Sequence, residues 1–215
     1  MNKYILIDLE DTITIHEYKD RIKNVMLKWL EYNKVTNPIE IYNDCRFKNR
    51  ESRLKLLNIT MEEYKNWYNN FSDVEFNTYY NNYKNGKISI KDDAFIFIQK
   101  CNLPLILVSN SSPKWIDYIL QEYNLKDYFR YIFKRDYIVD DIKKPDPKVI
   151  DIIKKDLKDE ISNESIVVGD SFDDYRLAQN CNFKFISMYN SFDDCKVCKN
   201  FNELLSIIHN FETIS

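Results

Sequence analysis

The sequence has 215 residues, of which 44% are hydrophobic and 30% are charged, and its formal net charge is −3. This is the composition of a globular protein with room for one α/β domain and an added module, and it argues against a disordered chain. The acidic balance also disfavours nucleic acid as a partner, because proteins that bind the phosphate backbone usually present a basic surface.

Membrane and disulfide signals are weak in this chain. No run of about 18 apolar residues predicts a transmembrane helix, and the first residues lack the long apolar region of a signal peptide. We therefore expect a cytoplasmic protein with no membrane partner. Five cysteines are an odd number and favour free thiols. Cys195 and Cys198 form a C-x-x-C pair, but a zinc site needs a second pair or nearby histidines.

Five short apolar runs predict buried strands, rich in Ile and Val and without clean alternation. That pattern is typical of a parallel sheet covered on both faces. Helical stretches separate the runs, and two of them follow a Ser-Pro or Asp-Pro pair that resembles a helix start. The order predicts a doubly wound α/β fold. The expected strands are 4–7, 105–108, 131–133, 166–168 and 184–187, and the expected helices are 92–101, 115–123, 148–157, 173–180 and 202–210.

One interval, from about residue 16 to residue 88, breaks this alternation. It contains no convincing strand signal, and aromatic and aliphatic residues recur there at helical spacing. We expect these aromatics to form the core of a helical bundle. The predicted organisation is an α/β core made of residues 1–14 and 89–215, with an all-helical domain inserted at residues 15–88.

Polar residues follow four of the predicted core elements, and ligands of open parallel sheets bind beyond the carboxyl ends of the strands. The first run ends in Asp8-Leu9-Glu10-Asp11-Thr12, whose crowded acids call for a compensating cation. Beside Mg²⁺, a carboxylate at a strand tip is a plausible nucleophile for phosphorus. Taken alone, the pattern is also compatible with an ordinary acidic turn.

The second and third features contribute polar and basic groups. The run LILVS ends in Ser109-Asn110, where a hydroxyl and backbone N–H groups could hold phosphoryl oxygens. In Lys144-Pro145-Asp146-Pro147 two prolines stiffen the chain before a helix, so Lys144 is held in a fixed loop. An ordinary turn and a solvent-exposed lysine explain these two features equally well when each is taken alone.

The fourth feature is IVVGDSFDD, which carries Gly169, Asp170 and Asp174. Glycine permits a sharp exit from the strand. Asp170 and Asp174 lie four residues apart around a turn that enters a helix, so both can face one hard cation. Mg²⁺ prefers a few carboxylates together with water and substrate oxygens. Capping of the helix N-terminus by acidic residues is the structural alternative.

Together these four motifs resemble the haloacid dehalogenase superfamily, in particular its phosphatase-like members with an inserted helical cap. The family pattern is Asp-x-Asp-x-Thr, then a strand ending in Ser or Thr with Asn, then Lys-Pro, then Gly-Asp-x-x-x-Asp. The resemblance covers essentially the whole chain. Nine residues match it: Asp8, Thr12, Ser109, Asn110, Lys144, Pro145, Gly169, Asp170 and Asp174. Asn182 replaces a glycine of the family, and asparagine tolerates the left-handed conformation.

The resemblance implies a Rossmann-like core, Mg²⁺ as cofactor and a role for each matched residue. Asp8 would be the nucleophile and a metal ligand, with the backbone carbonyl of Glu10 and the carboxylate of Asp170 as further ligands. Asp174 would support the metal site. Ser109, Asn110 and Lys144 would bind phosphoryl oxygens, and Lys144 would also stabilise Asp8 and so act in catalysis.

Glu10 departs from the family pattern, which has Asp as the general acid/base two residues after the nucleophile. The unperturbed pKa values of the two residue types are similar. The extra methylene of Glu moves the carboxyl by roughly 1 Å, and misplacement on that scale can cost on the order of 100-fold in rate. Either the inserted domain accommodates the longer side chain, or turnover is slow.

The leading functional prediction is a Mg²⁺-dependent phosphatase acting on a small phosphorylated metabolite, such as a sugar phosphate, phosphoglycolate or a nucleoside monophosphate. Two alternatives stay open. One is a phosphomutase or phosphotransferase of the same family, and the other is a catalytically weakened binding or regulatory protein marked by Glu10. Arg46, Arg50 and Arg53 share one predicted helical face and are candidates for contacting the leaving group. A solvated helix face explains the same spacing equally well.

Overall fold

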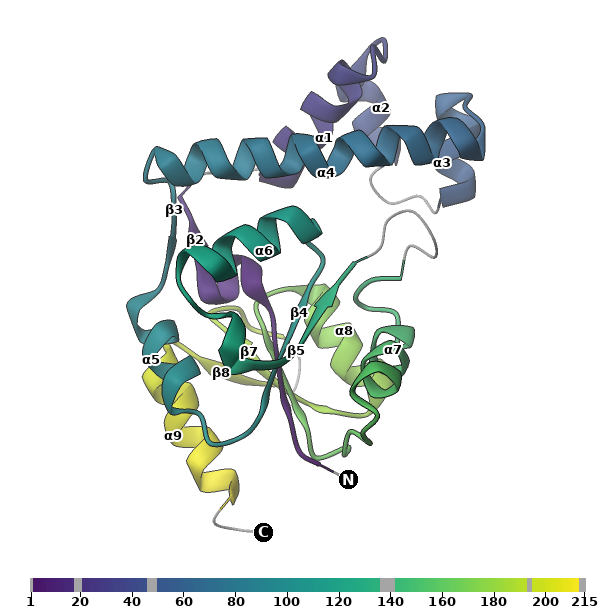
Figure 1. The fold of residues 1–215 in the computed structure, drawn as a ribbon. Helices are drawn as coiled ribbons and strands as arrows, with labels where there is room; N and C mark the ends of the chain where they lie inside the picture. The colour runs from purple at the N-terminus through teal and green to yellow at the C-terminus, as the bar shows by residue number, and fades with distance from the viewer. Residues whose placement is uncertain (1, 18–20, 46–49, 136–141, 193–194, 213–215) are drawn as a thin grey trace.

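The structure is a computed structural model that describes residues 2–17, 21–45, 50–135, 142–192 and 195–212. Its centre is a six-stranded sheet in which every neighbouring pair of strands is parallel (Figure 1). The strands, in spatial order, are β5 (Phe129–Lys134), β4 (Leu105–Ser109), β1 (Ile5–Ile7), β6 (Ile166–Gly169), β7 (Lys184–Met188) and β8 (Lys196–Cys198).

Helices cover both faces of this sheet, which confirms the predicted doubly wound α/β fold. Along β1, Ile5 and Ile7 belong to one apolar cluster and Leu6 belongs to the other. Helices α5 (Asp92–Lys100), α6 (Pro113–Glu122) and α9 (Phe201–Glu212) contribute to the first cluster, and α7 (Lys148–Leu157) and α8 (Phe172–Cys181) contribute to the second. Both faces are apolar, which explains why the strands read as continuous hydrophobic runs.

All five predicted core strands and all five predicted core helices are present, with ends that differ by at most two residues. Strand β8 was not predicted, because it has three residues and begins with a lysine. Helix α8 ends as expected, since Asn182 takes the left-handed conformation with φ 58° and ψ 37°.

The insertion consists of α1 (Arg21–Tyr32), α2 (Pro38–Cys45), α3 (Arg50–Leu57) and α4 (Met61–Lys84), all inside the predicted interval 15–88. Strands β2 (Thr14–His16) and β3 (Ile88–Ile90) connect it to the core and pair antiparallel with each other. The expectation that the interval lacks strands is wrong at its two edges. Three residues are too few to produce a readable alternation.

Aromatic packing explains how the insertion holds together and how it docks. Trp29 of α1 contacts Trp67 and Phe71 of α4 at ring-centroid distances of 5.9 and 5.5 Å. Further along α4, Tyr79 meets Trp115 of α6 edge to face at 5.3 Å. Figure 1 shows α4 lying above α6. The predicted bundle aromatics therefore serve two interfaces, one inside the insertion and one against the core.

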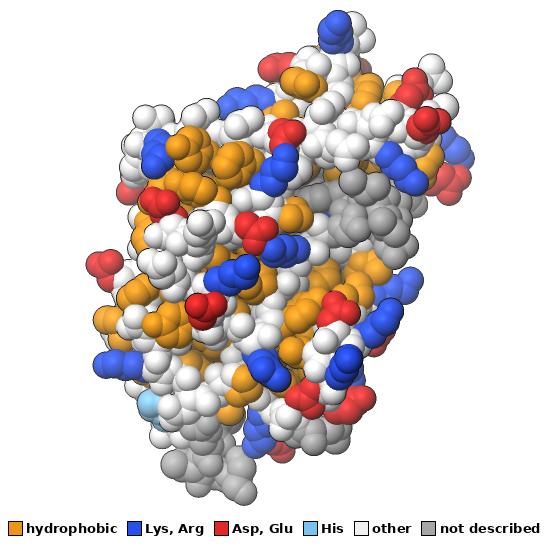
Figure 2. Space-filling model, viewed as in Figure 1, with side chains coloured by type: hydrophobic (Ala, Val, Ile, Leu, Met, Phe, Trp, Pro, Cys, Tyr) orange, Lys and Arg blue, Asp and Glu red, His pale blue; other side chains and the backbone are white. Residues whose placement is uncertain are grey.

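The surface agrees with the composition. On the face drawn in Figure 2, basic and acidic side chains are interspersed, and no basic stripe separates from the acidic groups. Within the described ranges, no helix combines the length and apolar character that crossing a bilayer requires. Cys195 and Cys198 are free thiols, and burial raises the pKa of Cys198 to about 11.

Candidate active site

The polar residues predicted from three strand ends meet at one edge of the sheet. Asp8 directly follows β1, Ser109 ends β4 and Asp170 directly follows β6. The register places Ile7 level with both Leu107 and Val168, so these strand ends lie side by side. This is the carboxyl edge of a parallel sheet, where such folds bind ligands.

Lys144 joins this cluster through two short ion pairs. Its Nζ lies 2.5 Å from Oδ1 of Asp8 and 2.6 Å from Oδ1 of Asp174, and all three side chains are buried. Desolvation lowers the pKa of Lys144, but the negative charges of Asp174 and Asp8 outweigh it and raise that pKa. The lysine is therefore a fixed positive charge beside the predicted nucleophile.

Asn110 positions Lys144 from the next loop. Its Oδ1 accepts a hydrogen bond from the Lys144 backbone N–H at 2.9 Å, and its Nδ2 donates to the Lys144 carbonyl at 3.1 Å. The same Nδ2 lies 3.4 Å from Oδ2 of Asp173. The Asn110 amide, predicted to bind phosphoryl oxygens, is thus occupied in bracing the lysine loop.

Asp174 is held in place from its own helix. Its Oδ2 accepts hydrogen bonds from the Ser171 hydroxyl at 2.5 Å and the Ser171 backbone N–H at 3.1 Å, which completes a capping box at the start of α8. A Cβ on Gly169 would overlap the Asp174 carboxyl group. Close approach of this carboxylate, rather than a positive φ, explains why residue 169 is glycine.

A divalent cation fits this donor set. One carboxylate oxygen from each of Asp8, Asp170 and Asp174 lies within 4.8 Å of the other two. Among the described residues, these three form a group that could hold a metal ion. Burial raises the pKa of Asp8, and Asp174 and Asp170 raise it further while Lys144 opposes them. Three carboxyl groups therefore crowd around the single charge of Lys144, and a few oxygen ligands of this kind suit Mg²⁺.

The turn after β1 places Glu10. Asp11 has φ 59°, a left-handed conformation that aspartate tolerates better than most residues. Nζ of Lys91, the residue directly after β3, donates to the carbonyls of Asp11 and Thr12 at 2.7 Å each. The Thr12 hydroxyl donates to Asp170 at 3.1 Å. The turn is therefore fixed to the return strand of the insertion and to the neighbouring motif.

Four side chains hold the Glu10 carboxylate. Oε1 accepts hydrogen bonds from Nε1 of Trp115 at 2.7 Å and from the Ser111 hydroxyl at 3.1 Å. Oε2 accepts from the Thr14 hydroxyl at 3.3 Å and contacts Nε2 of His16. These donors lie on β2, on the loop after β4 and on α6. The longer glutamate side chain is thus accommodated by hydrogen-bond partners on three elements of the fold.

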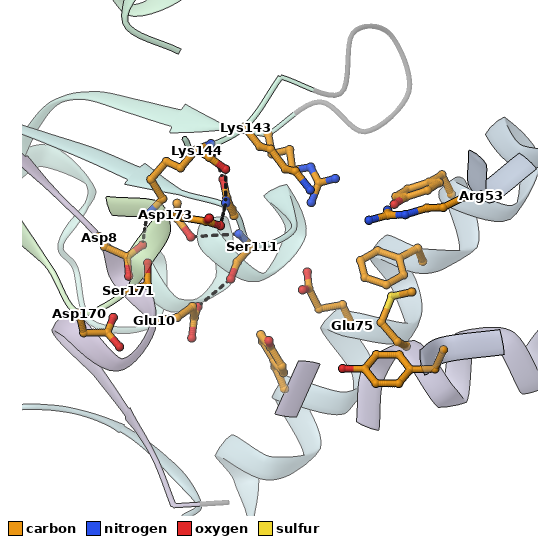
Figure 3. A pocket seen from close by; sticks show the side chains of 18 residues that line it. Asp8, Glu10, Arg53, Glu75, Ser111, Lys143, Lys144, Asp170, Ser171 and Asp173 are labelled. Atoms are coloured by element: carbon orange, nitrogen blue, oxygen red, sulfur yellow. Dashed lines mark hydrogen bonds and ion pairs between the residues drawn. The ribbon is translucent and has the colours of Figure 1, made fainter. Parts of the chain in front are cut away.

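The insertion closes a cavity of about 390 Å³ over these groups. Figure 3 shows Glu75 and Arg53 of the insertion facing the same space as Glu10, Ser111 and Lys143 of the core. Of the three arginines predicted to contact a leaving group, Arg53 lines this cavity, whereas Arg46 and the Arg50 side chain lie outside the described residues. The insertion also contributes an apolar wall made of Met26, Tyr42, Tyr68, Phe71 and Tyr79.

Several residues of the site were not predicted from the sequence. Glu75 is the most notable, since it is 6% exposed and sits in the middle of α4. In the sequence it stands among the polar residues of a long helix, where a glutamate normally faces solvent. The donors to Glu10 escaped for a related reason, because His16, Thr14, Ser111 and Trp115 belong to no motif. The one hint in the sequence was Glu10 itself. Its longer side chain, in place of the family's Asp, indicated that additional hydrogen-bond donors would be needed around its carboxylate.

Comparisons with known proteins bear on the family and the fold of this chain. Residues 3–182 match the sequence model of the haloacid dehalogenase-like hydrolases. No curated protein matches the chain. Similar solved structures include a haloacid dehalogenase-superfamily hydrolase from Ehrlichia chaffeensis, at 16% identity and a TM-score of 0.58, with 99% of each chain covered.

Two further similar structures were solved with ligands. CbbY from Rhodobacter sphaeroides, in complex with phosphate, has 16% identity, a TM-score of 0.63 and coverage of 95% of this chain and 96% of its own. YfnB from Bacillus subtilis, bound to magnesium, has 16% identity, a TM-score of 0.61 and coverage of 96% and 98%. At these identities the likeness concerns the fold. Because the family match spans most of the sequence and the fold agrees, the chain belongs to the haloacid dehalogenase-like hydrolases.

Proposed function

We propose that this hydrolase is a Mg²⁺-dependent phosphatase that acts on a small phosphorylated metabolite, with Asp8 as the nucleophile. The observation that carries the proposal is the buried Lys144, which pairs with Asp8 at 2.5 Å beside the cavity. A fixed cation next to a carboxylate suits an anionic substrate, because it neutralises both the nucleophile and the incoming phosphoryl group.

The reaction has two displacements at phosphorus. In the first, a carboxylate oxygen of Asp8 bonds to phosphorus, the ester P–O bond breaks, and the leaving oxygen takes a proton from Glu10. In the second, a water molecule gives a proton to Glu10 and attacks phosphorus. The Asp8–phosphorus bond then breaks, inorganic phosphate is released and the carboxylate is restored.

The remaining residues position and neutralise charge. Ser109 ends β4 at the cavity and donates to a phosphoryl oxygen, together with Lys144. Asn110 acts through Lys144, whose backbone it holds. When bound through Asp8, the Glu10 carbonyl and Asp170, with Asp174 in support, Mg²⁺ supplies positive charge against the phosphoryl oxygens. The phosphate bound in CbbY supports the proposed phosphate-binding role of this site, and the magnesium bound in YfnB supports the proposed metal site.

The experiment is hydrolysis of a generic aryl phosphate with Mg²⁺, with chelator, and with Ca²⁺ in place of Mg²⁺. We expect activity with Mg²⁺ only, because Ca²⁺ prefers more ligands at longer distances. Asp8→Asn should abolish turnover and leave the fold intact, with its mass confirming that no deamidation has occurred. Asp151→Asn, an exposed carboxylate of α7, is the matched control. Full activity in chelator, or in Asp8→Asn, would sink the proposal.

A further inference from the structure

Glu75 is a carboxylate inside a cavity that is proposed to receive an anion. It belongs to α4, it is buried, and it lines the same cavity as Asp8 and Lys144. In Figure 3 its carboxyl group lies in the open space between Glu10 and Arg53. A buried carboxylate works against phosphate binding, so its presence suggests a role toward the rest of the substrate.

The Glu75 carboxylate binds at the N-terminus of α6. Its Oε2 accepts a hydrogen bond from the backbone N–H of Ser112 at 2.6 Å. Ser112 is the N-cap of α6, and its own side chain makes no capping hydrogen bond. Free N–H groups at a helix N-terminus attract carboxylates and phosphates of ligands. Here the protein's own carboxylate already holds that position.

The cavity lining has no excess positive charge that could bind a second anionic group. Formally, the lining carries four cations and five carboxylates, and a bound Mg²⁺ balances a phosphate dianion. Arg135, which is buried, interacts electrostatically with Glu75 and so offsets it. The cations are Arg53, Arg135, Lys143 and Lys144, and the carboxylates are Asp8, Glu10, Glu75, Asp170 and Asp173.

We propose that Glu75 selects phosphate esters whose leaving group is uncharged and presents a hydroxyl group to this carboxylate. The inference rests on the proposed function and narrows it to phosphorylated polyols and sugars, and it disfavours phosphoglycolate, whose leaving group carries a carboxylate. Met26, Tyr42 and Phe71 of the insertion line the cavity beside Glu75 and provide a surface for the carbon skeleton.

The protonation of Glu75 is compatible with this role. Burial raises its pKa to about 7; its hydrogen bonds with Ser112 and the charge of Arg135 act in the opposite direction, and Glu10 raises the pKa further. A hydroxyl group can donate to the ionised carboxylate and accept from the protonated one. A ligand carboxylate can only accept, so the ionised form repels it.

The test compares glycerol 3-phosphate with 3-phosphoglycerate. At the end opposite the phosphate, the first carries a hydroxymethyl group and the second carries a carboxylate. Dissociation constants are measured by calorimetry on the Asp8→Asn variant with Mg²⁺, and kcat/KM is measured on the parent. With Glu75 present we expect glycerol 3-phosphate to be preferred by roughly tenfold or more, the effect of one like-charge contact. Glu75→Gln keeps an acceptor for the Ser112 N–H and should reduce the preference to within about threefold.

Controls separate this inference from the proposed function. Glu62→Gln, an exposed glutamate of the same helix, should leave the preference unchanged. If Glu75→Gln does not fold, Glu75→Met tests the same loss of charge. A parent that prefers 3-phosphoglycerate, or a preference that survives both substitutions, overturns the role of Glu75. Absence of turnover with every phosphate ester would instead contradict the proposed function, because the dissociation constants do not depend on hydrolysis.

Discussion

The α/β core and the helical insertion contribute to one cavity by different means. In the core, three site residues sit at or directly after strand ends, and the loop residue Lys144 is fixed by Asp8 and Asn110. In the insertion, Glu75 and Arg53 project from helix faces between aromatic side chains. Strand ends place groups by topology, whereas helix faces place them by packing. We therefore expect the core to fix the proposed chemistry and the insertion to adapt to the substrate.

Removing Lys144 should produce the largest effect, and it tests the core side of this comparison. Lys144→Met leaves Asp8 and Asp174 buried without their cation, which costs about 3–5 kcal/mol of stability. Turnover should fall by on the order of 1,000-fold or more. Thermal unfolding and aryl phosphate kinetics measure the two losses, and added Mg²⁺ should recover part of the stability. Lys148→Met, an exposed lysine of α7, should change neither quantity.

Glu75 tests the insertion through the pH dependence of stability. Its pKa is raised from 4.5 to about 7, so the folded state holds the proton more tightly than the unfolded state. The stability that protonated Glu75 contributes is complete below pH 4.5 and is lost as pH rises through 7. Relative to the parent, Glu75→Gln should therefore gain up to about 3 kcal/mol between pH 4.5 and pH 8.

Denaturant unfolding of both proteins across this pH range gives the difference directly. Glu10 and Arg135 interact electrostatically with Glu75 and are present in both proteins. A difference that stays constant with pH would show that the pKa of Glu75 is not raised in the folded state. Aryl phosphate turnover at saturating substrate should change little, which sets this residue apart from the core groups.

Glu10 stands where the two regions meet, and two substitutions sharpen its role. Glu10→Gln should lose on the order of 100-fold in turnover with alkyl phosphates and less with aryl phosphates, whose leaving groups hardly need a proton. Glu10→Asp should also be slower than the parent, because the shorter side chain withdraws from Trp115 and Ser111. A faster Asp variant would mean that the natural residue restrains hydrolysis. No change in Glu10→Gln with either substrate class would remove Glu10 from proton transfer.

Alanine substitutions of the two glycines, one in the core and one at the end of the insertion, should produce the smallest effects. Gly169→Ala places a Cβ against the Asp174 carboxyl group, so we expect a loss of about 1–3 kcal/mol and a clear fall in turnover. Gly86, in the turn after α4, has φ +69° with open space around it. Gly86→Ala should cost about 1 kcal/mol through backbone strain alone and leave turnover intact. Equal activity losses in the two variants would contradict the division between core and insertion.

Much of the core was predictable from the sequence for physical reasons. Strands buried on both faces produce continuous apolar runs, and their shared carboxyl edge brings Asp8, Ser109 and Asp170 together without further information. The clustering of Asp8 with Asp170 and Asp174 followed from the same logic. The short strands β2, β3 and β8 were not predictable, because three residues carry too little periodicity.

The unpredicted part of the site depends on single long-range contacts. Glu75 reaches Ser112 from 37 residues away, and Asn110 holds a backbone that is 34 residues away. No local pattern distinguishes such a glutamate or asparagine from a solvated one. His16 could be placed beside Glu10 only once the pairing of β2 with β3 was known.

The β2–β3 pair has a consequence for rebuilding the protein from parts. The backbone N–H of Glu17 donates to the Lys87 carbonyl at 2.9 Å, so the chain leaves and re-enters the core at adjacent points. A segment from another protein, or a tight turn, could join residues 17 and 87 without breaking a core strand. Thr14 and His16 would stay with the core and keep their contacts to Glu10. Such an exchange would uncover Trp115 and Tyr118 on α6, so a viable graft must bring its own aromatic partners for that helix.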